Sequence, residues 1–407
     1  MTAPSYPLPF GVFSVGAGRP RVGVAVGDHV LDLAAALDDP VFDNTTLNPF
    51  LARGPREWLA ARAALQALLN STDSEIVARR ERHRIPIADV RMHLPIDVAD
   101  FVDFFSSLEH ASNAGRILRP GEEPLKPNWR HLPVGYHGRA GTVVVSGTPI
   151  RRPWGQSKAP DSGAVHYTPS SKLDIEVELG FIVGAGSPLG ATVGVDEFKQ
   201  HVFGAVLLLD WSARDIQAWE YVPLGPFLGK SFATTISPWV IPLDALTGAE
   251  VTPVPQDPPP QPHLTGTAPF SYDIGLELRL NGHLISAPGF ASMYWTPAQQ
   301  LAHMTSNGAS LRTGDLYGTG TISSWDKAGY GSFMELTWNG QQPIRLPGGD
   351  ERGYLEDGDV VTVSATALAP DGGRVDFGQV SGHILPARST DTDPGFAPSL
   401  PAEQESA

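Results

Sequence analysis

The 407-residue sequence contains no cysteine. This absence excludes a disulfide framework, a thiolate nucleophile and a zinc site built on thiolates. Basic residues are also scarce, since 29 Lys and Arg stand against 44 Asp and Glu, and the formal net charge at pH 7 is −15. This acidic balance argues against nucleic acid or an anionic membrane as a partner.

Long apolar segments are missing as well. The longest apolar run, near residues 205–209, is far too short to cross a bilayer, and the first residues lack the charged and apolar regions of a signal peptide. Residues 221–231 are one position short of a phosphate-binding loop, and neither G-x-S-x-G nor H-E-x-x-H occurs. We therefore expect a cytoplasmic protein that acts on a small molecule.

The composition that remains is rich in turn residues, with 43 Gly and 38 Pro beside 41% hydrophobic residues. This combination is typical of a β-rich globule with many tight turns. Residues 1–95 read as a small separate unit of short strands with an amphipathic helix over 56–69. Residues 96–386 form a larger unit, and the Pro-, Ser-, Thr- and Asp-rich residues 387–407 are expected to be a disordered tail.

Residues 173–179 alternate strictly between apolar and acidic side chains, which predicts a β-strand. One face of this strand carries Asp174, Glu176 and Glu178. The pattern alone fits a solvated strand face, and it also fits two carboxylates, Glu176 and Glu178, that converge on a hard cation. A further acid, Asp210, directly after the apolar run 203–209 favours the cation, and we expect it at the carboxyl end of that strand.

Other candidate residues lie in helices and loops. Asp103 precedes a predicted helix over 104–115, and His110 falls on the same face two turns away, although Asp103 fits a helix N-cap equally well. The loop over 127–139 is rich in His, Arg and aromatic residues, which commonly line sites. The glycine-rich turn over 318–323 has amides that could face a ligand, and Glu335 lies in a predicted strand over 334–338.

Two local patterns predict further elements. Asn281-Gly282 predicts a hairpin with a type I′ turn between the runs 272–280 and 283–286. The segment T-P-A-Q from Thr296 predicts a helix that opens with a capping box.

Several motifs together resemble the fumarylacetoacetate hydrolase family. They are D-F-F-S-S from Asp103 with His110, L-P-V-G-Y-H-G-R over 132–139, S-G-T-P-I-R-R-P over 146–153, the acidic strand, and segments 210–215, 219–230 and 320–323. The similarity runs nearly continuously from Asp103 to Pro386. It implies a mostly β, α+β protein and a homodimer, with a small SH3-like N-terminal barrel in 1–95 and a larger catalytic β-roll domain in 96–386.

The resemblance also implies a divalent cation, Ca²⁺ or Mg²⁺, and an all-carboxylate shell is the donor set that hard cations prefer. The implied metal ligands and their neighbours are Asp103, Glu176, Glu178, Asp210, Lys230 and Thr234. His110 is implied as the general base, oriented by Glu335. The implied groups around the developing oxyanion are Arg214, Gln217 and Lys230. The implied substrate contacts are Phe105, Arg119, Tyr136, Gln217, Tyr221 and Thr321. The family has Tyr where this chain has Phe105.

The implied reaction is hydrolysis of the carbon–carbon bond of 4-fumarylacetoacetate to fumarate and acetoacetate, the last step of tyrosine and phenylalanine degradation. Hydrolysis of a carbon–carbon bond requires a carbanion as the leaving group, and this carbanion is stable enough only as an enolate. A β-diketone bound to a metal ion through its oxygens can leave as such an enolate. Two alternatives stay open: hydrolysis of another β-diketone acid, as in the acylpyruvate-type members of the superfamily, and a non-catalytic metal-binding or assembly protein. The pair His110–Glu335 and the motif over 221–230 favour the first reaction.

Overall fold

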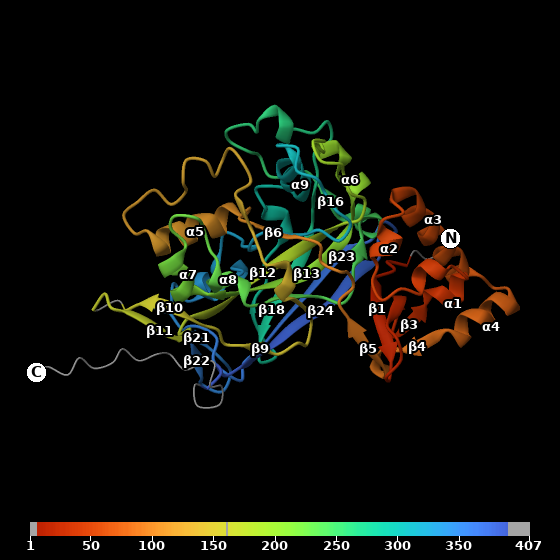
Figure 1. Cartoon of the computed structure of the whole chain (residues 1–407), viewed down its shortest axis with the longest axis horizontal. Helices are drawn as coiled ribbons and strands as arrows, with labels where there is room; N and C mark the ends of the chain where they lie inside the picture. The colour runs from red at the N-terminus through yellow and green to blue at the C-terminus, as the bar shows by residue number, and fades with distance from the viewer. Residues whose placement is uncertain (1–5, 160–161, 390–407) are drawn as a thin grey trace, which may run out of the picture.

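The computed structural model describes residues 6–159 and 162–389, and its N-terminal part is built on a five-stranded antiparallel sheet at one end of the molecule (Figure 1). The strand order is β4-β3-β2-β1-β5. The strands are β1 (Phe10–Val15), β2 (Arg21–Val26), β3 (His29–Asp32), β4 (Arg84–Pro86) and β5 (Val90–His93). The helices of this part are α1 (Leu33–Leu37), α2 (Asn48–Leu51), α3 (Pro55–Asn70) and α4 (Ser74–Arg82). The predicted helix over 56–69 is confirmed as α3, which buries Trp58, Leu65 and Leu68.

The centre of the molecule is a long antiparallel ribbon of β12 (Leu173–Val183) and β13 (Val202–Ala213). Every residue of both strands is buried. They lie inside an eight-stranded sheet of order β7-β6-β20-β12-β13-β14-β8, with β15 paired to β13. Its other strands are β6 (Phe101–Phe104), β7 (Gly135–His137), β8 (Val143–Val145), β14 (Thr234–Ile236), β15 (Ile241–Pro242) and β20 (Leu316–Gly318). The acidic strand predicted over 173–179 is therefore real, and it lies in the core.

A second, five-stranded sheet packs on this ribbon, in the order β19-β18-β23-β24-β9. Its strands are β9 (Ile150–Arg151), β18 (Ile274–Leu280), β19 (His283–Ser286), β23 (Val360–Leu368) and β24 (Arg374–Leu385). The predicted two-residue turn between β18 and β19 is confirmed, since Asn281 and Gly282 both have the positive φ of a type I′ turn. The two sheets approach closely where Gly382 faces Trp211, because a Cβ on Gly382 would lie 2.3 Å from the indole.

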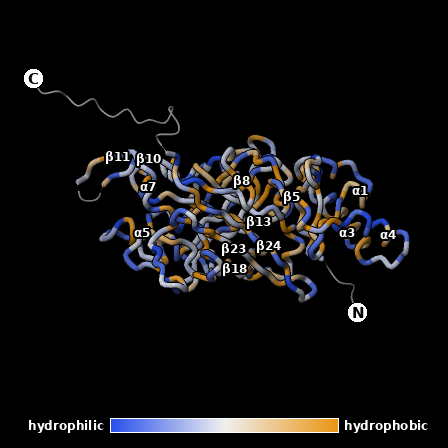
Figure 2. Tube along the Cα trace, turned by 90° about the horizontal axis from the view of Figure 1, so that it is seen from below, coloured by the Kyte–Doolittle hydropathy of each residue, from blue (hydrophilic) through white to orange (hydrophobic). Residues whose placement is uncertain are grey.

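Short ribbons and helices complete the fold around these sheets. The ribbons pair β10 (Trp154–Lys158) with β11 (Val165–Pro169), β16 (Glu250–Val251) with β17 (Ser271–Tyr272), and β21 (Ile344–Arg345) with β22 (Glu351–Arg352). The helices are α5 (Leu108–Leu118), α6 (Phe198–His201), α7 (Arg214–Glu220), α8 (Leu228–Ser231), α9 (Pro297–Thr305) and α10 (Phe333–Leu336). Figure 1 shows α5, α7, α8 and the β10–β11 ribbon at the end opposite the N-terminal sheet. In Figure 2 hydrophobic segments gather along the inner strands, whereas α4 at the periphery is largely hydrophilic.

The start of α5 corrects the sequence-based prediction. Residues 101–104 pair with β20 as a strand, so Asp103 lies on β6 and the helix begins only at Leu108. Ser107 is the N-cap and accepts a hydrogen bond from His110 N at 3.1 Å. Gly115 does not end the helix, because it lies inside it, where a Cβ would clash with the Pro124 carbonyl at 1.9 Å. Pairing of β6 with β20 and β7 outweighs the helical pattern here.

Two further sequence-based statements concern the remaining segments. The capping box predicted at the start of the helix after Thr296 is confirmed in α9. From residue 390 onward the predicted tail 387–407 lies outside the described residues. Among those that are described, no helix combines the length and apolarity needed to span a bilayer.

Phe203 of β13 links the N-terminal sheet to the central ribbon. Its ring packs edge-on against Phe10, Phe50 and Trp58, with centroid distances of 5.4–5.8 Å. We expect Phe203→Ala to lower the free energy of unfolding by about 3–5 kcal/mol, because the buried ring leaves a cavity. Leu59→Ala, at an exposed position of α3, is the control and should change it by less than about 0.5 kcal/mol. Urea unfolding measures both, and equal losses for the two variants would contradict the prediction.

Candidate metal centre and active site

Three strands bring four carboxylates together in the interior. Glu176 on β12 lies directly opposite Asp210 on β13, Glu178 follows on the same face of β12, and Asp103 projects from β6. Each offers an oxygen such that all four oxygens lie within 4.8 Å of one another. The four residues are 0–5% exposed, so the interpretation of a solvated strand face is wrong. Asp210 also does not end its strand, because β13 stays paired with β12 as far as Ala213.

The oxygens of this cluster are incompletely satisfied. Asp103 Oδ1, Glu178 Oε1 and Asp210 Oδ1 are buried and have no hydrogen-bond partner among the described residues. An unpaired polar atom away from water costs free energy, and an unpaired carboxylate costs most. Four converging carboxylates without nitrogen or sulfur ligands match the oxygen donors that a hard divalent cation prefers. The residues present therefore fit the implied cation.

The glycine-rich segment predicted over 318–323 packs against two of these acids. Gly320 N donates a hydrogen bond to Glu178 Oε2 at 3.0 Å. A Cβ on Gly318 would lie 2.6 Å from that same oxygen and 2.8 Å from Asp103 Oδ1. Only glycine at position 318 allows β20 to approach the two carboxylates this closely.

Two basic side chains, Lys230 and Arg214, neutralise one side of the carboxylate cluster. Lys230 of α8 donates hydrogen bonds to Glu176 and Asp210, and Arg214 at the start of α7 donates from Nη2 to Glu176 Oε1 at 2.7 Å. Burial opposes ionisation of Glu176, but Arg214 and Lys230 hold its pKa well below the usual range. For the other three acids, burial is the largest influence on the pKa. It raises the pKa of Asp103, and with repulsion from neighbouring acids it raises the pKa values of Glu178 and Asp210 well above the usual range.

His110 stands between this cluster and a second acid. Its Nδ1 lies 2.7 Å from Glu335 Oε2, and its Nε2 lies 3.4 Å from Glu176 Oε1. The ring of Phe105 packs edge-on against the imidazole, with centroids 5.3 Å apart. Burial alone would lower the pKa of His110, but the carboxylates of Glu335 and Glu176 outweigh it and raise this pKa to about 9. The imidazole is thus oriented, with Nδ1 towards Glu335 and Nε2 towards the carboxylate cluster.

Glu335 corrects another expectation, because residues 333–336 form the short helix α10 and not a strand. Ser332 caps this helix, and its Oγ donates to Glu335 Oε2 at 2.8 Å. Ser323 Oγ donates to the same oxygen at 2.8 Å, and Asn113 Nδ2 donates to Oε1 at 3.0 Å. Sequence reasoning missed these three partners. The S-x-x-E pattern from Ser332 to Glu335 is a capping signature that could have revealed the helix.

A pocket of about 620 Å³ opens onto the cluster. Its wall includes Asp103, Glu176, Lys230, His110, Arg214 and most of the predicted substrate contacts, namely Phe105, Arg119, Tyr136, Gln217 and Tyr221. Five predicted residues are not at this wall, namely Glu178, Asp210, Glu335, Thr321 and Thr234. Thr321 is buried and its Oγ1 has no partner among the described residues, and Thr234 lies on β14 opposite Asp210. The structure thus brings together the predicted base, the basic side chains Arg214 and Lys230, and most of the predicted substrate contacts around one pocket.

Comparison with known proteins agrees with this site. A family model described as Fumarylacetoacetate (FAA) hydrolase C-terminal matches residues 101–379, and one described as Fumarylacetoacetase N-terminal matches residues 6–95. The chain belongs to the fumarylacetoacetate hydrolase family. Fumarylacetoacetases of Rattus norvegicus and Homo sapiens are each 47% identical to it, covering 94% of this chain and 96% of the relative. The Arabidopsis thaliana fumarylacetoacetase is 45% identical, covering 93% and 95%.

Solved structures share the family fold at low sequence identity. The fumarylacetoacetate hydrolase from psychrophilic Exiguobacterium antarcticum has a TM-score of 0.55 and 20% identity, covering 94% of this chain and all of that one. The maleylpyruvate hydrolase from Sphingobium sp. SYK-6, in complex with manganese (II) ion and pyruvate, has a TM-score of 0.53 and 16% identity, with the same coverage. These likenesses confirm the predicted class as far as a mixed helix-and-strand fold with curled sheets.

The raised pKa values predict a cation affinity that depends on pH. Glu178 and Asp210 hold protons in the metal-free fold at pH values where free carboxyl groups have lost them, and cation binding must displace these protons. The apparent affinity for Mg²⁺ or Ca²⁺ should therefore rise from pH 5.5 to 8, by about tenfold per pH unit for each proton released. The stability of the metal-free protein should fall over the same window, because its fold binds more protons than the unfolded chain does.

Calorimetric titrations in buffers of different ionisation enthalpy count the protons that the cation releases. Glu178→Gln is the informative comparison, because it removes one titrating group and should flatten the dependence on pH. An affinity that stays constant between pH 5.5 and 8 would contradict the assigned direction of these pKa values.

Proposed function

We propose that this chain hydrolyses the carbon–carbon bond of 4-fumarylacetoacetate to fumarate and acetoacetate, the last step of tyrosine and phenylalanine breakdown. The observation that carries the proposal is one pocket lined by Asp103 and Glu176 of the carboxylate cluster and by His110, whose Nδ1 contacts Glu335. The relatives named fumarylacetoacetase, which align with at least 93% of the chain, support the same activity. A non-catalytic metal protein would not need a paired imidazole beside the cluster.

The residues proposed to hold the cation are Asp103, Glu176, Glu178 and Asp210, with Ca²⁺ or Mg²⁺ as the ion. When bound, such a cation polarises the diketone oxygens of the substrate and compensates the charge of the departing enolate. Lys230 and Arg214 keep Glu176 ionised and ready to bind metal. Competition between Mg²⁺ and Ca²⁺ in a calorimetric titration distinguishes the two ions.

His110 is the proposed general base. Glu335 fixes the ring through Nδ1, so Nε2 is the atom that takes a proton from water. The same carboxylate stabilises the imidazolium that results, because its own pKa is lowered by His110 and by its hydrogen-bond donors despite burial. Without a bound cation the pKa of His110 is about 9. Further positive charge at Glu176 would lower this pKa towards the range in which Nε2 is unprotonated and can accept a proton.

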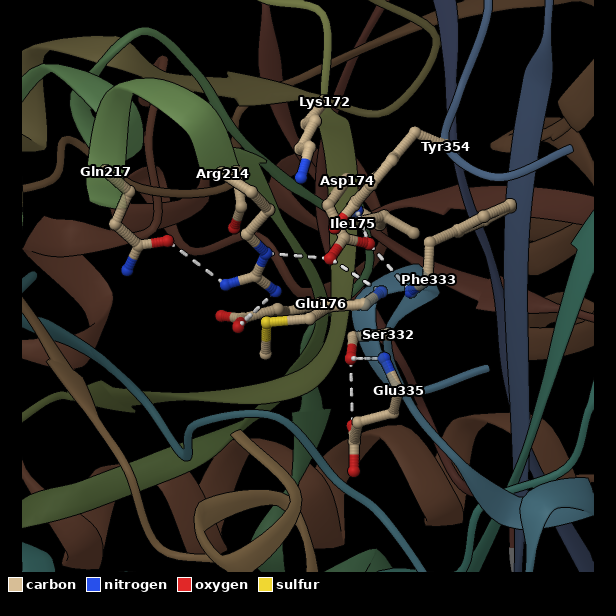
Figure 3. A network of polar contacts seen from close by, with 12 residues as sticks. Lys172, Asp174, Ile175, Glu176, Arg214, Gln217, Ser332, Phe333, Glu335 and Tyr354 are labelled. Carbon is tan, nitrogen blue, oxygen red and sulfur yellow. Dashed lines mark hydrogen bonds and ion pairs between the residues drawn. The ribbon is translucent and has the colours of Figure 1, made fainter. Parts of the chain in front are cut away.

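Three polar side chains are proposed to stabilise the oxyanion that forms when water adds to the fumaryl carbonyl. Arg214 and Lys230 bring fixed positive charge to the pocket wall. Gln217 Oε1 accepts a hydrogen bond from Arg214 Nη1 at 3.1 Å, which turns its amide nitrogen away from the guanidinium (Figure 3). The carbon–carbon bond then breaks, and the departing enolate takes the proton that His110 Nε2 received from water.

Arg119, Tyr136, Tyr221 and Thr321 are the proposed substrate contacts, with Phe105 where the family has a hydroxyl group. Arg119 supplies a cation for a substrate carboxylate at the pocket wall. The apolar ring of Phe105 at the same wall favours a second candidate substrate, a β-diketone acid with an apolar group at that point.

A direct assay separates these candidates. The purified protein with Mg²⁺ or Ca²⁺ is given fumarylacetoacetate or an acylpyruvate in water enriched in ¹⁸O. The proposal predicts faster loss of fumarylacetoacetate, with one labelled oxygen in a carboxylate of fumarate. Faster cleavage of the acylpyruvate would favour the alternative reaction, and cation binding without any turnover would favour a non-catalytic protein.

Replacement of the base tests its role. His110→Ala should lower kcat by about 10²–10⁴, because general-base catalysis is lost, while cation binding persists. Glu335→Gln should cost less, since the amide keeps the side-chain shape and removes only the charge that orients and stabilises the imidazole. Turnover and calorimetric cation binding are measured on both variants. Near-normal kcat in His110→Ala would mean that another group is the base.

The remaining proposals concern organisation. We propose that residues 1–95 are an SH3-like N-terminal domain, that residues 96–386 are the catalytic β-roll domain, and that the protein is a cytoplasmic homodimer without nucleic-acid or membrane partners. An exposed apolar cluster beside the pocket supports a dimer; it consists of Val222, Leu224, Phe227 and Leu228, of which Leu224 is 95% exposed. Sedimentation equilibrium of the wild type and of Leu224→Glu tests whether this surface joins two copies.

A further inference from the structure

Asp174 is a buried acid of β12 that the reaction proposed above does not use. It lies two residues before Glu176 on the same face of the strand, and its side chain is fully buried. It does not line the 620 Å³ pocket. Figure 3 shows it at the centre of a polar network, between Arg214 on one side and α10 on the other.

Four nitrogen donors surround the Asp174 carboxylate. Arg214 Nε donates to Oδ2 at 2.7 Å. On the α10 side, Phe333 N donates to Oδ1 at 2.7 Å and Met334 N donates to Oδ2 at 3.0 Å. Its neighbour Ile175 N donates to Oδ1 at 2.7 Å. Both oxygens therefore accept two hydrogen bonds each, and the side chain has no freedom to turn.

The network has two arms, by which we mean the hydrogen bonds on either side of Asp174. The first arm leads to Arg214, one of the side chains proposed to stabilise the oxyanion. Arg214 donates from Nε to Asp174, from Nη2 to Glu176 and from Nη1 to Gln217. Because the guanidinium is planar, two carboxylates that hold Nε and Nη2 fix the plane in which the third nitrogen points. Without Asp174 the guanidinium would keep its bond to Glu176 but lose the constraint on its rotation.

The second arm leads to the proposed base. The amides of Phe333 and Met334 are the first two of α10, and they have no partners within so short a helix. Asp174 anchors both, and Glu335 follows directly in the same turn. Glu335 in turn holds His110 Nδ1 at 2.7 Å. The position of the base thus depends on the place where α10 is tied to β12.

We propose that Asp174 is a positioning residue that fixes Arg214 and the Glu335–His110 pair relative to each other. This inference rests on the proposed hydrolysis, in which one arm stabilises the oxyanion and the other activates water. Both groups must act on the same carbonyl, so an error in their spacing affects the transition state more than the binding of substrate. A single carboxylate that contacts both arms removes that error.

Asp174→Asn tests the proposal. The amide keeps the volume of the side chain, but its nitrogen cannot accept hydrogen bonds, so at least one arm loses its anchor. We expect kcat to fall by about 10²-fold, the cost of a displacement near 1 Å. KM should change by less than about threefold, because Asp174 does not line the pocket.

A matched control separates positioning from stability. Asp359 is also buried, and its carboxylate accepts hydrogen bonds from Arg352 Nε, Asn281 Nδ2 and the amide of Glu356, away from the pocket. Asp359→Asn should lower the melting temperature as a lost buried ion pair does, yet keep wild-type kcat. If the two variants lose stability and turnover in the same proportion, Asp174 is only structural and the proposal is overturned.

Double variants test the coupling between the arms. In the Glu335→Gln background the further loss caused by Asp174→Asn should be clearly smaller than in the wild type, because the second arm is already impaired. Fully multiplicative losses would overturn the proposal. If Asp174→Asn does not fold, Asp174→Glu decides, since it keeps the charge but displaces the carboxylate; a kcat within twofold of wild type would then refute the assigned role.

These outcomes also separate the inference from the function on which it rests. Wild-type protein that does not hydrolyse fumarylacetoacetate contradicts the proposed function, whatever the variants do. Wild-type turnover with an unimpaired Asp174→Asn variant contradicts the positioning role alone.

Discussion

Repulsion among buried carboxylates is the constraint on which the rest of the site depends. Asp103, Glu178 and Asp210 each have a buried oxygen without a hydrogen-bond partner among the described residues, and Lys230 and Arg214 neutralise mainly the side of Glu176. An arrangement of this kind is stable only if protons or a cation offset the charge. The surrounding structure brings the acids together. The strand register places Glu176 opposite Asp210, and Gly318 lets β20 approach Glu178 and Asp103.

The rigidity of the site follows from where its residues lie in the fold. The four clustered acids sit on paired strands of the central sheet, and both faces of β12 and β13 are buried. Arg214, Lys230, His110 and Glu335 come instead from four helices. Hydrogen bonds to Asp174 or Asp210 tie α7, α8 and α10 to that sheet, and the bond between His110 and Glu335 ties α5 to α10. Helices and loops thus supply the chemistry, while the sheet sets the distances between the groups.

The sequence predicted the features that depend on local patterns. Alternation identified the acidic strand, Asn281-Gly282 identified the hairpin, and the capping box identified α9. The resemblance to a family supplied the identity of the site residues, and five of the substrate contacts that it implies lie at the pocket wall. Local pattern failed at α5 and α10. There strand pairing of residues 101–104 and a serine cap at position 332 override the apolar periodicity. Burial of the acidic face could not be read from alternation, since it depends on strands distant in sequence.

The central claim is that the four carboxylates hold a divalent cation that both stabilises the fold and enables turnover. The direct measurement strips the protein with a chelator and titrates Mg²⁺ or Ca²⁺ back, while melting temperature and hydrolysis of fumarylacetoacetate are followed on the same samples. The melting temperature and the rate of hydrolysis should both be low in the stripped protein and should recover together. At a concentration 100-fold over its dissociation constant, the cation should add about 2.7 kcal/mol to the free energy of unfolding. A stripped protein with unchanged melting and full turnover would contradict the account.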